Sequence, residues 1–566
     1  MRRQDSWDAI VVGSGITGGW AAKELSERGL RTLVLEAGRS IDPTHDYLMN
    51  APAYEYDFRT LNDRKRLNER QPVQQKCYAC DEGAAQFFVD DLDNPYTTPE
   101  GKPFDWIRGR QLGGKSIMWG RQCYRLSDLD FEANQRDGFG VDWPIRYRDL
   151  APWYDHVESY AGISGETLGL AHLPDGPFLP PMELTAAERM VREGISRRYG
   201  AERVLTIGRV AVLTEAHRGR APCHYCNACH HGCTTYSYFS SVHTTLPDAQ
   251  KTGRCTIRPQ SVVHSMIYDR DRRRVTGVQV VDAVTLDRLE FKASIVFLCA
   301  GTLESTRILL NSTGRGYETG LGNSSDQLGR NLMDHTMRAG ARGTVSGIEH
   351  LTTYGERPNG IYLPRFRNVT STHPEFVRGY GYQGGGYRER TGWERGVDQR
   401  GFGARFKDSL RNVEYGQWRM QLGGFGECLP DPSNRATLDS TVRDRWGVPA
   451  LHIDMQWGKN ELAMKRDMTE QAAEMLQAVG CTEVETYDNQ SPPGLTIHEM
   501  GTARMGRSKK TSVCNGHNQL WDAPNLFLTD GASMTSSGCQ NPSLTYMALT
   551  ARAAAFAVDA LRRKDI

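Results

Sequence analysis

The chain has 566 residues, of which 39% are hydrophobic and 24% charged, and its 69 lysines and arginines balance 68 acidic residues to leave a net charge of +1. This composition, with a mean hydropathy of -0.56, predicts a globular protein, excludes an integral membrane protein and offers no charge excess to attract nucleic acid. The length exceeds what one hydrophobic core supports and predicts about three to four domain-sized units.

The first predicted unit lies close to the N-terminus and reads DAIVVGSGITGGWAAKELSERGLRTLVLEAG. An apolar strand is followed by Gly13, Gly15 and Gly18 in the spacing G-x-G-x-x-G, then by a helix and a second strand that ends at Glu36. The first glycine permits a tight turn, the second lets backbone approach a pyrophosphate, and the third lets the helix pack on the strand. Because the acid can accept both ribose hydroxyls, the unit predicts a Rossmann-like domain for FAD or NAD rather than NADP.

The N-terminus itself, MRRQDSWDAIVVGSG, passes from two arginines directly into this strand. It shows neither an apolar h-region nor a cleavage site, so we expect the subunit to carry no export signal of its own.

Later segments alternate between this domain and a second one. Residues 41–105 are irregular and polar, which suits an excursion over the surface, and a helix is expected at 144–165 with a stop at Gly162. The stretch GRQLGGKSIMWG, with Gly113, Gly114 and Ser116, has the composition of a loop laid against a flat cofactor. Residues 255–301 predict a small sheet that returns to the dinucleotide domain, followed by a helix, TLESTRILLNS.

The remaining sequence predicts the second domain and a C-terminal helix. Residues 334–494 contain runs rich in Tyr, Gly, Arg and Trp, which predict antiparallel strands and loops. Within them, residues 354–400 would suit stacking on a sugar but equally suit a solvated loop. The chain then ends in an alanine-rich helix, LTYMALTARAAAFAVDALRR.

Four of the 13 cysteines lie in APCHYCNACHHGCTTYS, at Cys223, Cys226, Cys229 and Cys233. Their spacing, C-x2-C-x2-C-x3-C, is that of bacterial iron-sulfur ligands and favours a [4Fe-4S] or [3Fe-4S] cluster. Two alternatives stay open, because CNACH also matches c-type haem attachment and four thiolates suit structural zinc.

A second C-x-x-C pair is formed by Cys77 and Cys80 in QKCYACDEG. It could lend a ligand or form a disulfide, but we expect an inert pair on a surface loop.

Four landmarks in chain order resemble the glucose-methanol-choline (GMC) oxidoreductases, a flavoenzyme family: GSGITGG with Glu36, RGRQLGGKS, GECLPDPSNRATLDSTVRDRWGVP, and HEMGTARMG with TDGASMTSSGCQNPSLTYMAL. The resemblance implies an α/β fold in which a Rossmann-like FAD-binding domain is interleaved with an α+β substrate domain built on an antiparallel sheet. The implied FAD-binding segments are residues 1–45, 105–125, 205–335 and 490–566. The implied substrate-binding segments and surface excursions are residues 46–104, 126–204 and 336–489.

The resemblance also implies the site. His498 matches the base that takes the hydroxyl proton, Asn541 matches the partner that orients the same oxygen, and Asp530 and Gly531 match the segment along the flavin ribityl chain and pyrophosphate. Met118 stands where pyranose oxidases carry a histidine bound to flavin, so we expect dissociable FAD.

The His-Asn pair is similar to the pyranose oxidase, fructose dehydrogenase and glucoside 3-dehydrogenase side of the family. It implies an FAD-dependent dehydrogenase that oxidises a secondary hydroxyl of a sugar or glycoside at C3 and passes electrons through the cluster to a cytochrome c or another carrier. A small subunit with an export signal would then take the enzyme to the periplasm; otherwise it is cytoplasmic. Two alternatives are oxidation at C1 or C2, as in glucose or gluconate dehydrogenases and pyranose oxidase, and an electron-transfer flavoprotein without a small substrate.

Overall fold

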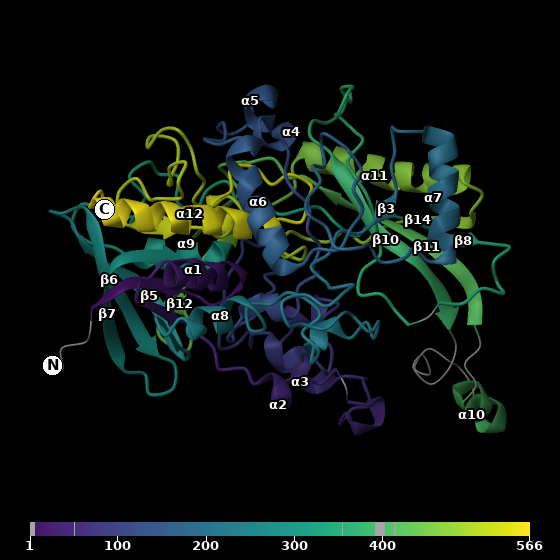
Figure 1. Ribbon diagram of the computed structural model, residues 1–566, viewed down its shortest axis with the longest axis horizontal. Coiled ribbons are helices and arrows are strands. Elements are labelled where there is room, and N and C mark those ends of the chain that lie inside the picture. Colours follow the sequence, from purple (N-terminus) through teal and green to yellow (C-terminus); the bar gives the residue numbers. More distant parts are fainter. Residues whose placement is uncertain (1–5, 50, 354, 391–401, 412–414) are drawn as a thin grey trace.

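The protein is described here by a computed structural model, in which residues 6–49, 51–353, 355–390, 402–411 and 415–566 are described. Two sheets lie along the long axis of the molecule, with the first to the left and the second to the right in Figure 1. Part of the aromatic stretch 354–400, namely residues 354 and 391–400, lies outside the described residues.

The first sheet is mixed. Its parallel part has the order β4 (Cys255–Arg258), β2 (Thr32–Leu35), β1 (Trp7–Val12), β7 (Arg288–Leu298), and β15 (Leu526–Leu528) pairs with the end of β7. The beginning of β7 instead pairs antiparallel with β6 (Arg274–Asp282), which pairs with β5 (Ser261–Asp269). The sheet predicted from residues 255–301 is thereby confirmed, and β7 joins it to the dinucleotide domain.

Helices cover this sheet and bury its apolar strands, as parallel strands require. Helix α1 (Ile16–Glu27) packs against α8 (Thr245–Lys251) and α12 (Ser543–Arg563), and α12 packs against α6 (Tyr147–Ala161). Helix α6 ends at Ala161, and Gly162, which follows it with φ +75°, is the stop that the sequence predicted. The helix predicted after residue 301 is α9 (Thr302–Asn311).

Helix α12 bears on the expectation that the chain does not cross a membrane. Among the described residues it is the one helix long and apolar enough to cross a membrane, with a mean hydropathy of 1.2. Because 67% of that window is buried inside the protein, against α1 and α6, it has the surroundings of a core helix.

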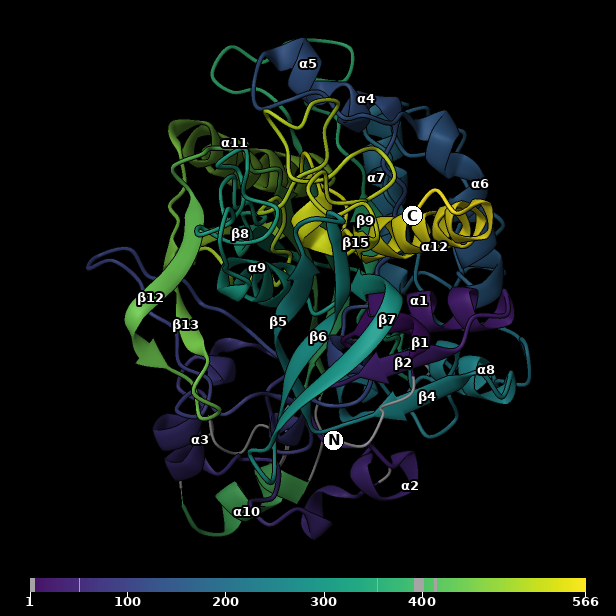
Figure 2. The same ribbon diagram turned by 90° about the vertical axis from the view of Figure 1, so that its left-hand side faces the viewer.

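The second sheet is antiparallel and lies on the far side of the cavity described below. Its order is β14 (Thr482–Asp488), β8 (Ala339–Val345), β11 (Tyr415–Gly426), β10 (Tyr380–Arg390), β9 (Ile361–Leu363), β3 (Thr206–Ile207). Helices α7 (Ala186–Tyr199) and α11 (Lys459–Ala478), which the sequence analysis did not predict, pack against it (Figure 1). The hairpin β12 (Arg435–Arg443) and β13 (Pro449–Asp454) stands apart from both sheets (Figure 2).

Three elements depart from the predicted domain ranges. Strand β3 falls in the FAD-binding range 205–335 but pairs with β9 in the second sheet, and two residues are too few for a periodic signal. Helix α6 and the β12–β13 hairpin fall in the substrate-binding ranges, yet they pack on α12 and α9 beside the first sheet. The position of an element along the chain therefore does not decide which of the two domains it joins.

Candidate functional site

A cavity of about 450 Å³ opens at the carboxyl ends of the parallel strands and reaches the second sheet. Gly13, Glu36 and Asp530 follow β1, β2 and β15 respectively, and all three line it. This is where open α/β sheets bind dinucleotides. Every predicted cofactor or catalytic position reaches the lining except Gly18 and Gly113, namely Gly13, Gly15, Glu36, Gly114, Ser116, His498, Asp530, Gly531 and Asn541.

The glycine turn has the shape that a pyrophosphate needs. At Gly13, φ is +93° and a Cβ would lie 2.5 Å from the Cys299 carbonyl oxygen, while a Cβ on Gly18 would lie 2.0 Å from the Gly13 carbonyl oxygen. A Cβ on Gly15 would meet no atom within 4 Å. The N-terminus of α1 is therefore open to the cavity at Gly15, so its backbone fits an anionic group there.

Glu36 is tied to this turn through a residue that the sequence analysis missed. Its carboxylate accepts hydrogen bonds from Ser14 Oγ at 2.5 Å, Ser14 N at 3.1 Å and Gly38 N at 2.8 Å, and burial raises the pKa of the carboxyl. Ser14 Oγ also accepts from Gly113 N at 2.9 Å. Ser14, hidden as a variable position of G-x-G-x-x-G, thus joins the two predicted cofactor loops.

The loop at Gly113 turns sharply before the short helix η4 (Gly114–Ile117). Gly113 and Gly114 have φ of +86° and +50°, and Ser116 Oγ donates to the Gly113 carbonyl at 2.6 Å. Gly113 itself packs away from the cavity, since a Cβ there would lie 2.4 Å from Val242. Met118 lines the cavity beside this loop.

Asp530 lines the same cavity and holds two chain segments together by hydrogen bonds. Its carboxylate accepts from Ser305 Oγ at 2.5 Å and from the backbone N–H groups of Gly301 and Ala532, both at 3.1 Å. Burial raises its pKa to about 6. Asp530 therefore joins the turn before α9 to the C-terminal segment, with Gly531 beside it against the cavity.

His498 and Asn541 come together at the side of the cavity nearer the second sheet. His498 Nε2 lies 3.4 Å from Asn541 Nδ2, and Gln383 Nε2, from β10, donates to Asn541 Oδ1 at 2.6 Å. Burial, assisted by His335 and the Lys115 cation, holds the pKa of His498 well below its usual value. The imidazole is therefore neutral near pH 7 and can accept a proton.

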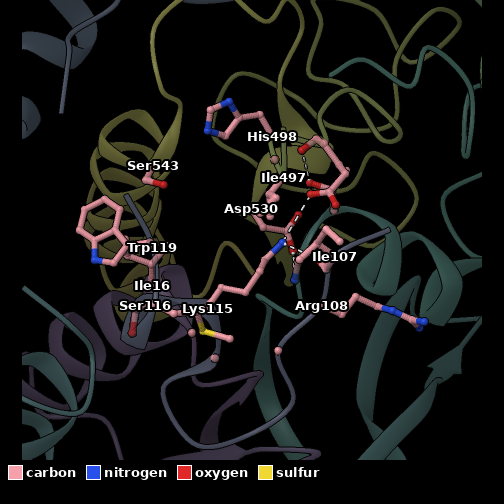
Figure 3. Close-up of a pocket in the computed structure, with 18 of the residues that line it drawn as sticks. Ile16, Ile107, Arg108, Lys115, Ser116, Trp119, Ile497, His498, Asp530 and Ser543 are labelled. Carbon is pink, nitrogen blue, oxygen red and sulfur yellow. Dashed lines mark hydrogen bonds and ion pairs between the residues drawn. The ribbon is translucent and has the colours of Figure 1, made fainter. Parts of the chain in front are cut away.

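Lys115 was also missed by the sequence analysis. It extends from the loop at the bottom of Figure 3 toward the segment that carries His498, and its Nζ lies 3.5 Å from Glu499 Oε2. A cation and a carboxylate thus form an ion pair in the same cavity as the imidazole.

The four cysteines of the predicted cluster lie outside the cavity lining. Cys229 and Cys233 are buried, Cys223 is half-buried and Cys226 is exposed. Cys223 Sγ accepts from Tyr225 N and Cys233 Sγ accepts from Ser237 N, both at 3.4 Å. Burial, with smaller contributions from the neighbouring cysteines, raises the pKa of Cys223 to about 11.

Arg121 and Tyr238 lie near both this loop and the cavity. Arg121 lines the cavity, and its guanidinium carbon lies 5.7 Å from the centre of the Tyr238 ring, whose hydroxyl donates to the Ile117 carbonyl. Tyr238 also belongs to the apolar cluster that contains Cys229 and Cys233, so Arg121 and Tyr238 connect the cysteine loop to the cavity wall.

The spacing of the metal-ligating side chains bears on the zinc alternative. Within the described ranges, the one group of three or more His, Cys, Asp or Glu ligand atoms all within 4.8 Å of one another is Asp81, His230 and His231. A tetrahedral zinc site needs four sulfurs about 4 Å apart, as Zn–S bonds of about 2.3 Å dictate. Among the described residues, no three of the four cysteine sulfurs lie that close to one another.

The expectation that Cys77 and Cys80 form a pair on a surface loop is wrong. Their exposed fractions are 5% and 4%, because the segment packs in an apolar cluster with Phe87 and Ile107. Cys77 lines the cavity, and Asp81, which follows the pair, accepts from His230 and His231 at 2.8 Å. This segment therefore runs from the cavity to the cysteine loop.

Comparison with known proteins identifies relatives over nearly the whole chain. Family models described as GMC oxidoreductase match residues 7–337 and 430–550. The 2-methyl-1,2-propanediol dehydrogenase of Mycolicibacterium austroafricanum is 29% identical over 97% of this chain and 94% of its own. The fructose dehydrogenase large subunit of Gluconobacter japonicus is 25% identical over 97% of both. The crystal structure of pyridoxine 4-oxidase from Mesorbium loti has a TM-score of 0.60 at 18% identity, covering 97% of this chain and 98% of its own.

Proposed function

The chain belongs to the GMC oxidoreductase family, and from this premise we propose that it oxidises a secondary hydroxyl of a sugar or glycoside, at C3, to the keto product. The predicted family and fold are confirmed, and GMC oxidoreductases bind FAD and act on CH-OH groups. The observation that carries the proposal is the His498–Asn541 pair at the far side of a cavity that begins at the glycine turn.

Different residues of the cavity bind the cofactor and take the substrate proton. Gly13, Gly15 and Glu36 would hold the dinucleotide, and bound FAD, held without a covalent bond, supplies the acceptor for the hydride. His498 Nε2 takes the hydroxyl proton, while Asn541 Nδ2 donates to the same oxygen and orients it. Proton and hydride together account for the two hydrogens that an alcohol loses.

Unpaired polar groups in the cavity support a substrate with several hydroxyls. Asn359 Oδ1 and Arg121 Nε are buried without a hydrogen-bond partner, and both residues line the cavity. An unpaired buried group costs about 1–3 kcal/mol, which a ligand hydroxyl would offset. Oxidation at C3 rests on the likeness of the His-Asn pair and its HEMGT context to the glucoside-oxidising side of the family.

We expect methyl α-D-glucopyranoside to bleach the flavin under anaerobic conditions, and its 3-deoxy analogue to leave the flavin oxidised. The glycoside has no free C1 hydroxyl, so bleaching also separates C3 oxidation from oxidation at C1, and product NMR locates the keto group. Free glucose as the sole active sugar would contradict the proposal and favour a glucose-type dehydrogenase.

A second candidate substrate class is a small diol. The 29% identity to 2-methyl-1,2-propanediol dehydrogenase favours it. Bleaching by that diol, without bleaching by either glycoside, would replace the sugar proposal with this one.

We further propose that Cys223, Cys226, Cys229 and Cys233 hold an iron-sulfur cluster. Their spacing, the two N–H···S hydrogen bonds and the apolar cluster that Cys229 and Cys233 share with Tyr238 support it. Such a cluster passes single electrons onward, and exposed Cys226 would face the acceptor, a cytochrome c or another carrier. A small subunit with an export signal would bring the enzyme to the periplasm.

Anaerobically purified protein is expected to contain about three to four iron atoms and as many labile sulfides per chain. Cys229→Ser should lose both, retain flavin reduction by substrate, and lose electron transfer to an external acceptor. Cys255→Ser, at the edge strand β4, is the matched control and should keep the metal. Zinc without sulfide, or a haem spectrum, would contradict the cluster.

A further inference from the structure

His335 lies behind the base on the side away from Asn541. It is fully buried, and its Nε2 lies 2.8 Å from the Gly538 carbonyl oxygen. Its Nδ1 lies 2.9 Å from Nδ1 of His498, and the two rings meet edge to face at 78°. One buried imidazole is thus bonded at both nitrogens, to a carbonyl on one side and to the base on the other.

The chemistry of these partners fixes where the hydrogens are. A carbonyl oxygen only accepts, so Nε2 of His335 carries a hydrogen. Burial lowers the pKa of His335 to about 4, so the ring is neutral and its Nδ1 is a bare acceptor. Since the contact between the two Nδ1 atoms needs one hydrogen, that hydrogen belongs to His498.

The opposite side of the base has the complementary polarity. With its hydrogen on Nδ1, His498 presents a lone pair at Nε2 toward Asn541 Nδ2, 3.4 Å away. Gln383 Nε2 donates to Asn541 Oδ1 at 2.6 Å, which keeps the Asn541 amide turned so that its N–H faces the base. The network therefore directs a donor from Asn541 and an acceptor from His498 to one point.

Asp334 holds the backbone of the same pair. Its carboxylate accepts from the backbone N–H of His498 at 3.1 Å and from that of Gly494 at 2.7 Å, and the next residue along the chain is His335. The positions of both histidines are thus set by a buried Asp-His dipeptide as well as by their own contact.

We propose that His335 is a positioning residue that keeps His498 in the Nδ1–H tautomer, so that the Nε2 lone pair faces the substrate hydroxyl. Its role in alcohol oxidation rests on the proposed function, whereas the tautomer does not. Without His335, the hydrogen of His498 can move to Nε2, where it occupies the site that must receive the substrate proton.

Two variants at this position separate positioning from packing. His335→Leu introduces an apolar side chain of similar bulk that has no hydrogen-bond acceptor. This variant is expected to reduce its flavin with substrate about 100-fold more slowly, with substrate affinity unchanged. His335→Asn places an amide oxygen near the former Nδ1, and should recover the rate to within about tenfold of the wild type. FAD content and the melting temperature are measured on both to verify the fold.

Equal losses in both variants would show a packing role and overturn the proposal, as would a Leu variant that is as fast as the wild type.

Neutron diffraction from hydrogen–deuterium-exchanged crystals of the FAD-bound protein tests the tautomer without any substrate. Deuterium is expected on Nε2 of His335 and Nδ1 of His498, and none on Nε2 of His498. Deuterium on Nε2 of His498 would overturn the proposal. If no alcohol or sugar reduces the wild-type flavin, the proposed function fails, and the neutron map still decides the tautomer.

Discussion

Replacing His498 with alanine is expected to slow anaerobic flavin reduction by substrate about 10²- to 10⁴-fold, the range that a positioned general base contributes. The variant loses the acceptor of the hydroxyl proton and leaves Asn541 to orient an oxygen that stays protonated. Stopped-flow measurement of flavin absorbance isolates this step, because it does not depend on the cysteine loop or on an external acceptor.

Two controls make the result specific to the imidazole. His498→Ala should bind FAD at wild-type stoichiometry and be reduced normally by dithionite. His264→Ala removes a histidine on β5, outside the cavity lining, and should reduce the rate by less than about twofold. A His498→Ala variant that matches the wild type would place the base elsewhere. A wild type that no substrate reduces would instead favour an electron-transfer flavoprotein.

The parts of the site that could be predicted are those encoded locally. The turn at Gly13 and Gly18 is a steric requirement of one strand–helix connection, so it is visible within six residues of sequence. His498 and Asn541 could be paired only because motifs around them resemble a family, since nothing in a 43-residue separation predicts a 3.4 Å contact.

The missed residues reach the site through tertiary structure. His335 is 163 positions from His498, and Gln383, from the second sheet, is 158 positions from Asn541. No local pattern marks either residue, because their partners are set by how the two sheets face the cavity. The burial of Cys77 could not be predicted either, because its neighbours in sequence are mostly polar and the apolar cluster that encloses it is formed by tertiary contacts.

Helix α11 is different, because its signal was present. Met464, Met468, Ala472 and Met475 recur at helical spacing and are all buried against the second sheet. The flanking sequence predicts mainly strands, and the helix was therefore included in the predicted antiparallel domain.

Two glycine substitutions in the same turn are expected to differ in effect: one should lower FAD affinity alone, and the other should also lower the stability of the fold. In Gly15→Ala, the new Cβ meets no atom within 4 Å, so the FAD-free protein should melt at nearly the wild-type temperature. The methyl group would project into the cavity at the N-terminus of α1, where the pyrophosphate approaches, and FAD affinity should fall at least about tenfold.

In Gly18→Ala, the new Cβ would lie 2.0 Å from the Gly13 carbonyl oxygen, and backbone must move to admit it. Such overpacking costs about 1–3 kcal/mol, so this variant should melt at a lower temperature even without FAD and should also bind FAD poorly, because the displaced Gly13 belongs to the turn itself. Thermal unfolding of the FAD-free proteins and titration with FAD measure the two effects separately. Wild-type FAD affinity in Gly15→Ala would show that no phosphate lies against this turn, and unchanged melting in Gly18→Ala would show that α1 does not pack on the turn as described.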